Sequence, residues 1–171
     1  MALAAGVDSI EHGSFLKDDT LLEMKKKHVY LVATLFAGAW VGEHLDTFPP
    51  AIAVKARAAA AQAQQMFQHA VKIGVPLAMG TDAAVEPHGL NAREFALMTR
   101  NGLTPAQALM AGTANGADLL GLADKIGTLA VGKSADIVAV AGNPLADIHA
   151  TEHPVFVMKE GAVYVGAGAA R

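Results

Sequence analysis

Apolar runs and amphipathic stretches alternate over the first 124 residues of the chain. Residues 29–35 are almost continuously apolar, which is typical of a strand buried on both faces of a parallel sheet. Asp18 and Asp19 begin a stretch with leucines at helical spacing and lysines at its end, which predicts a helix. The expected strands are 7–12, 29–35 and 75–82, and the expected helices are 18–27, 51–73, 91–101, 104–110 and 113–120. This alternation predicts an α/β fold.

Two segments differ from this alternation. Residues 36–50 hold two glycines and a pair of prolines, so we expect a long connection there. Beyond Asp124 the chain changes to short β-prone runs separated by glycine turns, and the expected strands are 126–129, 135–140, 155–158 and 162–165. We therefore divide the chain into an α/β part, residues 1–124, and a C-terminal β lobe, residues 125–171.

Three parallel strands are too few to close a barrel, and the first of them has an open edge. The α/β part is therefore expected to be an incomplete domain. The alternative is a small three-stranded α/β layer that is finished as it stands.

Composition excludes several classes of protein. The chain has no cysteine, which rules out disulfide scaffolds and thiolate-bound zinc but leaves the redox compartment open. The net charge of −3 makes nucleic acid a poor candidate partner. Charged residues or glycines interrupt every apolar run before it reaches the roughly 20 residues of a membrane span, so no membrane association is expected.

His12 and Asp82 stand where the first and third expected strands end. Catalytic groups of α/β barrels gather at the carboxyl ends of the strands, and imidazole with carboxylate suits zinc or a similar divalent ion. The alternatives are a histidine that is hydrogen-bonded to backbone and an aspartate that caps a turn. Because catalytic zinc usually has three or more protein ligands, a metalloenzyme would need ligands beyond these two.

His88 lies on the loop after the third expected strand and would face the same side as Asp82. It is a candidate substrate contact, and the alternative is a solvent-exposed loop histidine. The remaining histidines are expected to be structural or surface residues: His28, His44, His69, His149 and His153.

Three ordered motifs together resemble the amidohydrolase superfamily, and most closely its imidazolonepropionase-like and Xaa-Pro dipeptidase-like branch. The motifs are Gly-Val-Asp-Ser-Ile-Glu-His-Gly at 6–13, Gly-Thr-Asp-Ala at 80–83 with Pro-His-Gly at 87–89, and Gly-Thr-Leu at 127–129 followed by Gly-Lys-Ser-Ala-Asp-Ile-Val at 132–138. The resemblance covers nearly the whole chain.

The resemblance implies a TIM barrel with a small β-sandwich lobe, of which this chain would supply barrel strands six to eight and part of the lobe. It implies that His12 is the strand-six metal ligand. Asp82 would be the strand-eight aspartate, which ligates metal and handles the proton of the attacking hydroxide. His88 would lie near the substrate, and one or two divalent ions, zinc first among them, would be the cofactor.

The chain also departs from that family. The His-x-His pair of strand one, the bridging carboxylated lysine of strand four and the strand-five histidine have no counterpart in this sequence. The resemblance is therefore to the C-terminal portion of such an enzyme only. Either the chain is a truncated product or a second polypeptide supplies the rest.

The main functional hypothesis is a metal-dependent hydrolase of C–N bonds in an amide, dipeptide or cyclic amide. A ring deaminase or imidazolonase of the same superfamily is one alternative, and a catalytically inactive half-barrel is another. A small-molecule or dipeptide-like substrate is expected. Because the strand edge is open, we also expect self-association or pairing with a missing N-terminal half.

Overall fold

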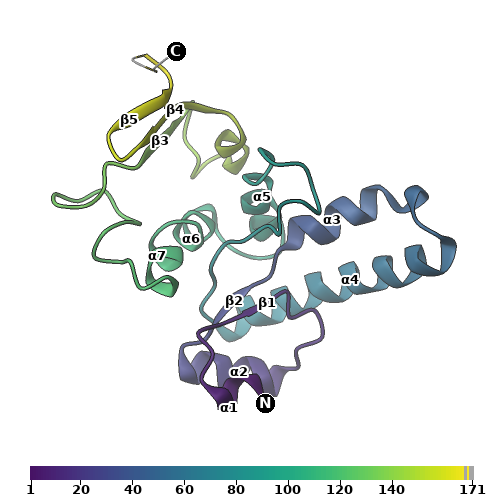
Figure 1. The fold of residues 1–171 in the computed structure, drawn as a ribbon. Coiled ribbons are helices and arrows are strands. Elements are labelled where there is room, and N and C mark those ends of the chain that lie inside the picture. Colours follow the sequence, from purple (N-terminus) through teal and green to yellow (C-terminus); the bar gives the residue numbers. More distant parts are fainter. Residues whose placement is uncertain (168, 170–171) are drawn as a thin grey trace.

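The computed structural model describes residues 1–167 and 169, and its first half is built around a parallel βαβ unit (Figure 1). A short helix, α1 (Ala2–Ala5), leads into β1 (Ser9–Glu11), α2 (Asp18–Lys27) and β2 (Tyr30–Val32). Strands β1 and β2 pair in parallel, with Ser9 opposite Tyr30 and Glu11 opposite Val32. The alternation of strand and helix confirms the α/β class expected from the sequence.

The third expected strand, residues 75–82, is reduced to a single bridge. Leu31 of β2 bridges Leu77 in parallel, with hydrogen bonds from Leu31 N to Pro76 O and from Ala78 N to Leu31 O. Beyond it, the Met79 N–H donates to Ala111 O of a helix, so this backbone group is used outside the sheet. The chain nevertheless runs parallel to β2 and delivers Asp82 to the same end of the sheet as His12.

The segment 36–50, expected to be a connection, holds a helix. The structure has α3 (Leu35–Glu43), a 3-10 turn η1 (Leu45–Thr47) and α4 (Pro50–Ile73). Helix α3 forms because the Glu94 side chain accepts hydrogen bonds from Leu35 N at 3.0 Å and Phe36 N at 2.7 Å. These N–H groups have no partner inside the helix, and a carboxylate 59 residues away satisfies them.

Helices α3 and α4 lie side by side and project beyond the sheet in Figure 1. They approach closely because small side chains line the contact. A Cβ added at Gly38 would lie 3.7 Å from the Cβ of Ala60. The close approach of these helices defines one wall of the candidate site.

The other expected helices are present within a residue or two of their predicted ends. They are α5 (Arg93–Arg100), α6 (Pro105–Ala111) and α7 (Ala114–Leu119). At the start of α6, Thr104 and Gln107 exchange side-chain and backbone hydrogen bonds in a capping box, with Pro105 in the first turn.

A three-stranded antiparallel sheet forms the C-terminal part, in the order β3 (Ile137–Val140), β4 (Pro154–Lys159) and β5 (Ala162–Val165). The 3-10 turn η2 (Ile148–Glu152) joins β3 to β4 and contacts α5. The parallel and antiparallel strands fall on opposite sides of residues 124 and 125, and the division into two domains there stays a prediction.

The strand expected at 126–129 is absent, so that prediction was wrong. Gly127 adopts a φ of +86°, and a Cβ there would lie 2.5 Å from the Cβ of Ala117. Lys133 Nζ donates to the carbonyl oxygens of Ala123 and Ile126 and to Thr128 Oγ1. Lys133 thus supplies a donor to backbone carbonyl oxygens that a neighbouring strand would otherwise bond. The segment 126–129 bends and pairs with no strand that the structure describes.

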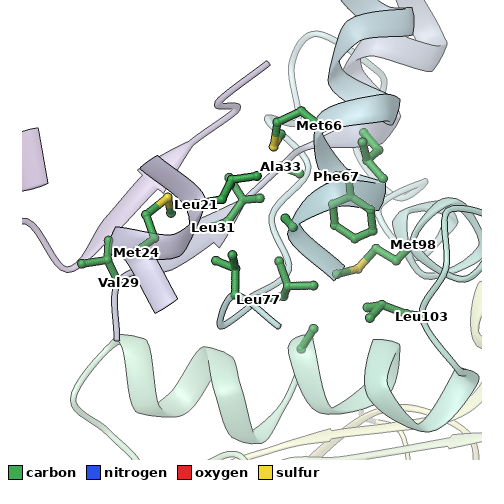
Figure 2. Close-up of a cluster of buried hydrophobic side chains, with 14 of the residues drawn as sticks. Leu21, Met24, Val29, Leu31, Ala33, Met66, Phe67, Leu77, Met98 and Leu103 are labelled. Atoms are coloured by element: carbon green, nitrogen blue, oxygen red, sulfur yellow. The ribbon is translucent and has the colours of Figure 1, made fainter. Parts of the chain in front are cut away.

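The main core lies between the parallel strands and helices α2, α4, α5 and α6 (Figure 2). Leu21 and Met24 of α2, Leu31 of β2 and Phe67 of α4 are all fully buried. Burial of a large apolar side chain contributes about 1.5–3 kcal/mol. Among the described residues, no helix is long and apolar enough to span a membrane.

Candidate active site

Three parallel segments end in residues with a left-handed backbone. His12 follows β1 with φ 58°, Thr34 follows β2 with φ 49°, and Asp82 follows the Leu77 bridge with φ 62°. This conformation costs roughly 1–2 kcal/mol for a residue with a Cβ, and it is rarest for a β-branched residue such as threonine. The turn at each strand end brings these side chains to one place, and strain of this kind is concentrated at functional sites.

The structure brings His12 and Asp82 together. His12 Nε2 lies 3.9 Å from Asp82 Oδ2, and both side chains are about half exposed, at 55% and 49%. The His12 ring is anchored by the Thr34 hydroxyl and not by backbone. The Asp82 carbonyl oxygen accepts from Val85 N at 3.1 Å, but the Asp82 carboxylate accepts no backbone hydrogen bond in the described part of the chain. The geometry therefore differs from both alternatives, a backbone-bonded histidine and a capping aspartate.

Sequence reasoning missed Thr34, which contacts this pair directly. His12 Nδ1 lies 2.7 Å from Thr34 Oγ1, and the threonine is 7% exposed. Its position at the end of the second strand was the signal that could have identified it, but a threonine there has many structural roles.

His88 lies apart from this pair. It is exposed, and it makes no hydrogen bond or ion pair with the residues that the structure describes. The adjacent loop is held by Asn91, whose side chain accepts from Gly89 N and donates to Thr81 Oγ1. The loop is therefore anchored next to Asp82, and His88 itself is exposed to solvent, which agrees with the alternative of a solvent-exposed loop histidine.

A cavity of about 200 Å³ opens beside the pair. Its polar lining residues are His12, Ser14, Thr34 and Asp82. Its walls are small side chains of α3 and α4, among them Ala37, Gly38, Ala60 and Ala63. A small apolar group could occupy this space while a polar group attached to it reached His12 and Asp82.

Two buried carboxylates lie near the start of α3, and the sequence did not single out either. Glu94 and Glu86 are each 1% exposed. Burial raises the pKa of Glu94 to about 7, the backbone N–H groups of Phe36 and Leu35 act in the opposite direction, and the charge of Glu86 raises it further. Both carboxylate oxygens of Glu86 lack a hydrogen-bond partner among the described residues.

The residues at the site fit a divalent cation only in part. Imidazole and carboxylate are suitable zinc ligands, but the described residues contain no group of three or more histidines and acids that could hold a metal ion. His12 and Asp82 are therefore two candidate ligands, one fewer than the three protein ligands that catalytic zinc usually has.

Most other histidines make local contacts away from this site. The contacts are His28 with Asp118 at 3.6 Å, His69 with Asp18 at 3.0 Å, His149 with Glu152 at 2.6 Å, and His44 with Trp40 O at 2.8 Å. These pairs agree with the structural or surface roles expected for them.

Residues 1–166 match the sequence profile of the Amidohydrolase family. Because the match covers almost the entire chain, the protein belongs to this family. This finding confirms the resemblance drawn from the strand-end motifs and places the α/β fold within a group of known structures.

Two relatives are similar over nearly the whole chain. A Xaa-Pro dipeptidase, whose crystal structure has methionine bound in the active site, is 40% identical and superposes with a TM-score of 0.92, covering 96% of this chain and 41% of the dipeptidase. Ochratoxinase from Aspergillus niger is 34% identical over an alignment of 173 positions, which covers 98% of this chain and 36% of that protein. Its crystal structure superposes with a TM-score of 0.85.

The chain thus spans about 40% of the length of these relatives. The matched portion contains the paired strands, the candidate site and the antiparallel sheet.

Proposed function

We propose that this chain is the C-terminal portion of a metal-dependent amidohydrolase that hydrolyses a C–N bond in an amide, dipeptide or cyclic amide. The observation that carries the proposal is the approach of His12 Nε2 and Asp82 Oδ2 to 3.9 Å at the carboxyl ends of parallel strands. In this proposal residues 1–124 are barrel strands six to eight with their helices. Residues 125–171 are part of the β-sandwich lobe.

His12 and Asp82 would hold a divalent ion, zinc in this proposal, with one or two ions in the complete enzyme. Such an ion supplies a Lewis acid that polarises a carbonyl group and lowers the pKa of bound water. The imidazole of His12 contributes a neutral nitrogen ligand. The Asp82 carboxylate accepts a proton from the attacking water and then donates it to the leaving nitrogen, which is the role expected of an acid and base within reach of both atoms.

The substrate class follows from the cavity and from the relatives. A small apolar group would enter the space between α3 and α4, which places the attached carbonyl at the His12 and Asp82 end. His88, on the anchored loop after Asp82, would contact the polar part of the substrate. Similarity to a Xaa-Pro dipeptidase supports a dipeptide or an N-acyl amino acid as substrate.

Two experiments test this proposal. The first is elemental analysis of the complete protein and its Asp82→Ala variant, with turnover measured against a panel of dipeptides and N-acyl amino acids. Loss of most turnover in the Asp82→Ala variant is expected, while Asp46→Ala, which changes an exposed aspartate in η1, serves as the control. A complete protein that kept full activity after Asp82→Ala would overturn the assignment.

The second experiment uses the 171-residue chain alone, where two ligands should bind zinc weakly. Calorimetric titration should show binding that is lost in His12→Ala and unchanged in His149→Ala, since His149 pairs with Glu152 away from the site. Equal loss in both variants would mean that His12 is not a ligand.

A catalytically inactive half-barrel is the second candidate. It is favoured by the incomplete ligand set and by β1, whose only strand partner among the described residues is β2. An unpaired strand edge promotes association, so this chain would pair with an N-terminal half or with itself. Sedimentation at micromolar concentration should show assemblies, and turnover by the purified chain alone would refute the inactive form.

A further inference from the structure

The Thr34 hydroxyl lies between the His12 ring and a backbone carbonyl. Thr34 Oγ1 is 2.8 Å from Ala33 O and 2.7 Å from His12 Nδ1. Thr34 and Ala33 are 7% and 5% exposed, so water contributes little to the hydrogen bond between them, whereas the His12 side chain is 55% exposed. The direction of the bond between Thr34 and Ala33 is therefore decided by the protein groups themselves.

A hydroxyl has one hydrogen to donate and can accept as well. The Ala33 carbonyl accepts no other hydrogen bond from the described residues, and a buried acceptor left without a donor costs about 1–3 kcal/mol. The hydroxyl hydrogen therefore goes to Ala33 O. Thr34 Oγ1 then has only lone pairs to offer His12, so Nδ1 must carry the ring proton.

We propose that Thr34 is a positioning residue that holds neutral His12 in the tautomer protonated at Nδ1, which leaves the lone pair of Nε2 facing Asp82. The distance from Nε2 to Asp82 Oδ2 agrees with this assignment. At 3.9 Å these two atoms are too far apart for a hydrogen bond, so no hydrogen bond to Asp82 requires a proton on Nε2.

The backbone holds Thr34 in place for this role. Its φ of 49° and ψ of 49° are strained for a β-branched residue, at roughly 1–3 kcal/mol. Glu94 accepts hydrogen bonds from the next two backbone N–H groups, those of Leu35 and Phe36. The buried carboxylate thereby fixes the turn that aims the threonine hydroxyl at His12.

The protonation of His12 at Nδ1 follows from its hydrogen bond to Thr34 and requires no metal. That the free Nε2 serves as a ligand rests on the proposed function. Hydrogen bonds to the second ring nitrogen of a ligating histidine commonly change metal affinity by about 10–100-fold. Thr34 would then act on metal affinity through His12 without touching the ion.

Long-range ¹H–¹⁵N correlation spectra of the ¹⁵N-labelled 171-residue chain test the tautomer at alkaline pH, where histidine rings are neutral. The His12 signals are identified by their loss in His12→Gln. The wild-type chain should show a protonated Nδ1 and an unprotonated Nε2. Magic-angle-spinning spectra of the sedimented chain report the same nitrogen types where the chain associates.

Thr34→Val removes the hydroxyl but keeps the β-branched shape, and Thr34→Ser restores a hydroxyl. The valine variant should move the ring proton wholly or partly to Nε2, and the serine variant should keep it at Nδ1. Unchanged signals from the other six histidines would show that both variants fold. A wild-type ring protonated at Nε2, or a valine variant that keeps Nδ1–H, would overturn the inference.

Zinc titration separates this inference from the proposed function. A loss of about tenfold or more in affinity is expected for Thr34→Val, with recovery in Thr34→Ser. If the wild-type chain has the Nδ1–H tautomer but binds no zinc, the positioning role of Thr34 stands and the metal function fails. If zinc binds equally well in the valine variant, the effect of Thr34 on metal affinity is refuted and the metal function stands.

Discussion

The buried carboxyl of Glu94 makes the stability of this protein depend on pH in a calculable way. Burial, helped by the charge of Glu86, raises the pKa of Glu94 to about 7 from its ordinary 4.5, against the effect of the N–H groups of Phe36 and Leu35. The folded state therefore binds the proton more tightly than the unfolded state. The stability from this group is fully present below about pH 4.5 and is lost as the pH rises through 7.

The size of the effect follows from the difference between the two pKa values. At about 1.4 kcal/mol for each pKa unit, the loss between pH 4.5 and pH 8 is about 3 kcal/mol. The side chain introduced by Glu94→Gln cannot ionise, so this variant does not undergo that loss of stability between pH 4.5 and pH 8. The amide has only one acceptor oxygen, so one of the two α3 N–H groups loses its acceptor, at about 1–3 kcal/mol. The variant should be the less stable protein at pH 5 and should approach or exceed the wild type at pH 8.

Urea unfolding followed by circular dichroism, repeated between pH 4.5 and 8, measures this difference. All other ionisable groups are shared by the two proteins, so their contributions cancel when the free energies of unfolding are subtracted. Glu43→Gln, at the exposed end of α3, is the matched control and should give no pH-dependent difference. Parallel pH curves for the wild type and Glu94→Gln would refute the elevated pKa of Glu94.

Three further substitutions test the packing and polar contacts. Phe67→Ala should destabilise the fold by about 3–5 kcal/mol because the ring is fully buried. Phe15 is 75% exposed, so Phe15→Ala should change stability by less than about 0.5 kcal/mol. Similar melting curves for the two variants would refute the placement of Phe67 in the core. Tyr30→Phe removes a 2.7 Å hydrogen bond to Asp118, whose side chain stays hydrated. The free energy of unfolding in urea should therefore fall by about 1 kcal/mol, and a fall of more than about 3 kcal/mol would contradict this expectation. Thr104→Ala removes the α6 cap and should cost about 1 kcal/mol, with Thr104→Ser as the control that retains most of it.

The predicted elements were most accurate where local chemistry decides them. Helix α2 has acidic residues at its start and lysines at its end, and it forms over the expected residues, 18–27. The capped start of α6 was also recognisable, because Thr104 and Pro105 form a local signal. These elements follow from interactions between neighbours in the chain.

The wrong predictions share a different cause. Helix α3 was expected to be a connection because its glycines argue against a helix, yet a carboxylate from α5 caps it. The strand expected at 126–129 is a turn because Lys133 bonds the oxygens of that segment. In both cases the decisive hydrogen-bond partner is a side chain whose target cannot be read from its own neighbours in the sequence.

The sequence by itself determined the α/β class, the family resemblance and the places of His12 and Asp82 at the ends of apolar runs. Only the tertiary structure decided how near these two side chains come, because left-handed turns at three strand ends set their direction. It also decided the environment of Glu94, since burial depends on elements packed from distant parts of the chain. Strand ends are local properties of a sequence, whereas the hydrogen-bond partner and the dielectric surroundings of a side chain are properties of the packed fold.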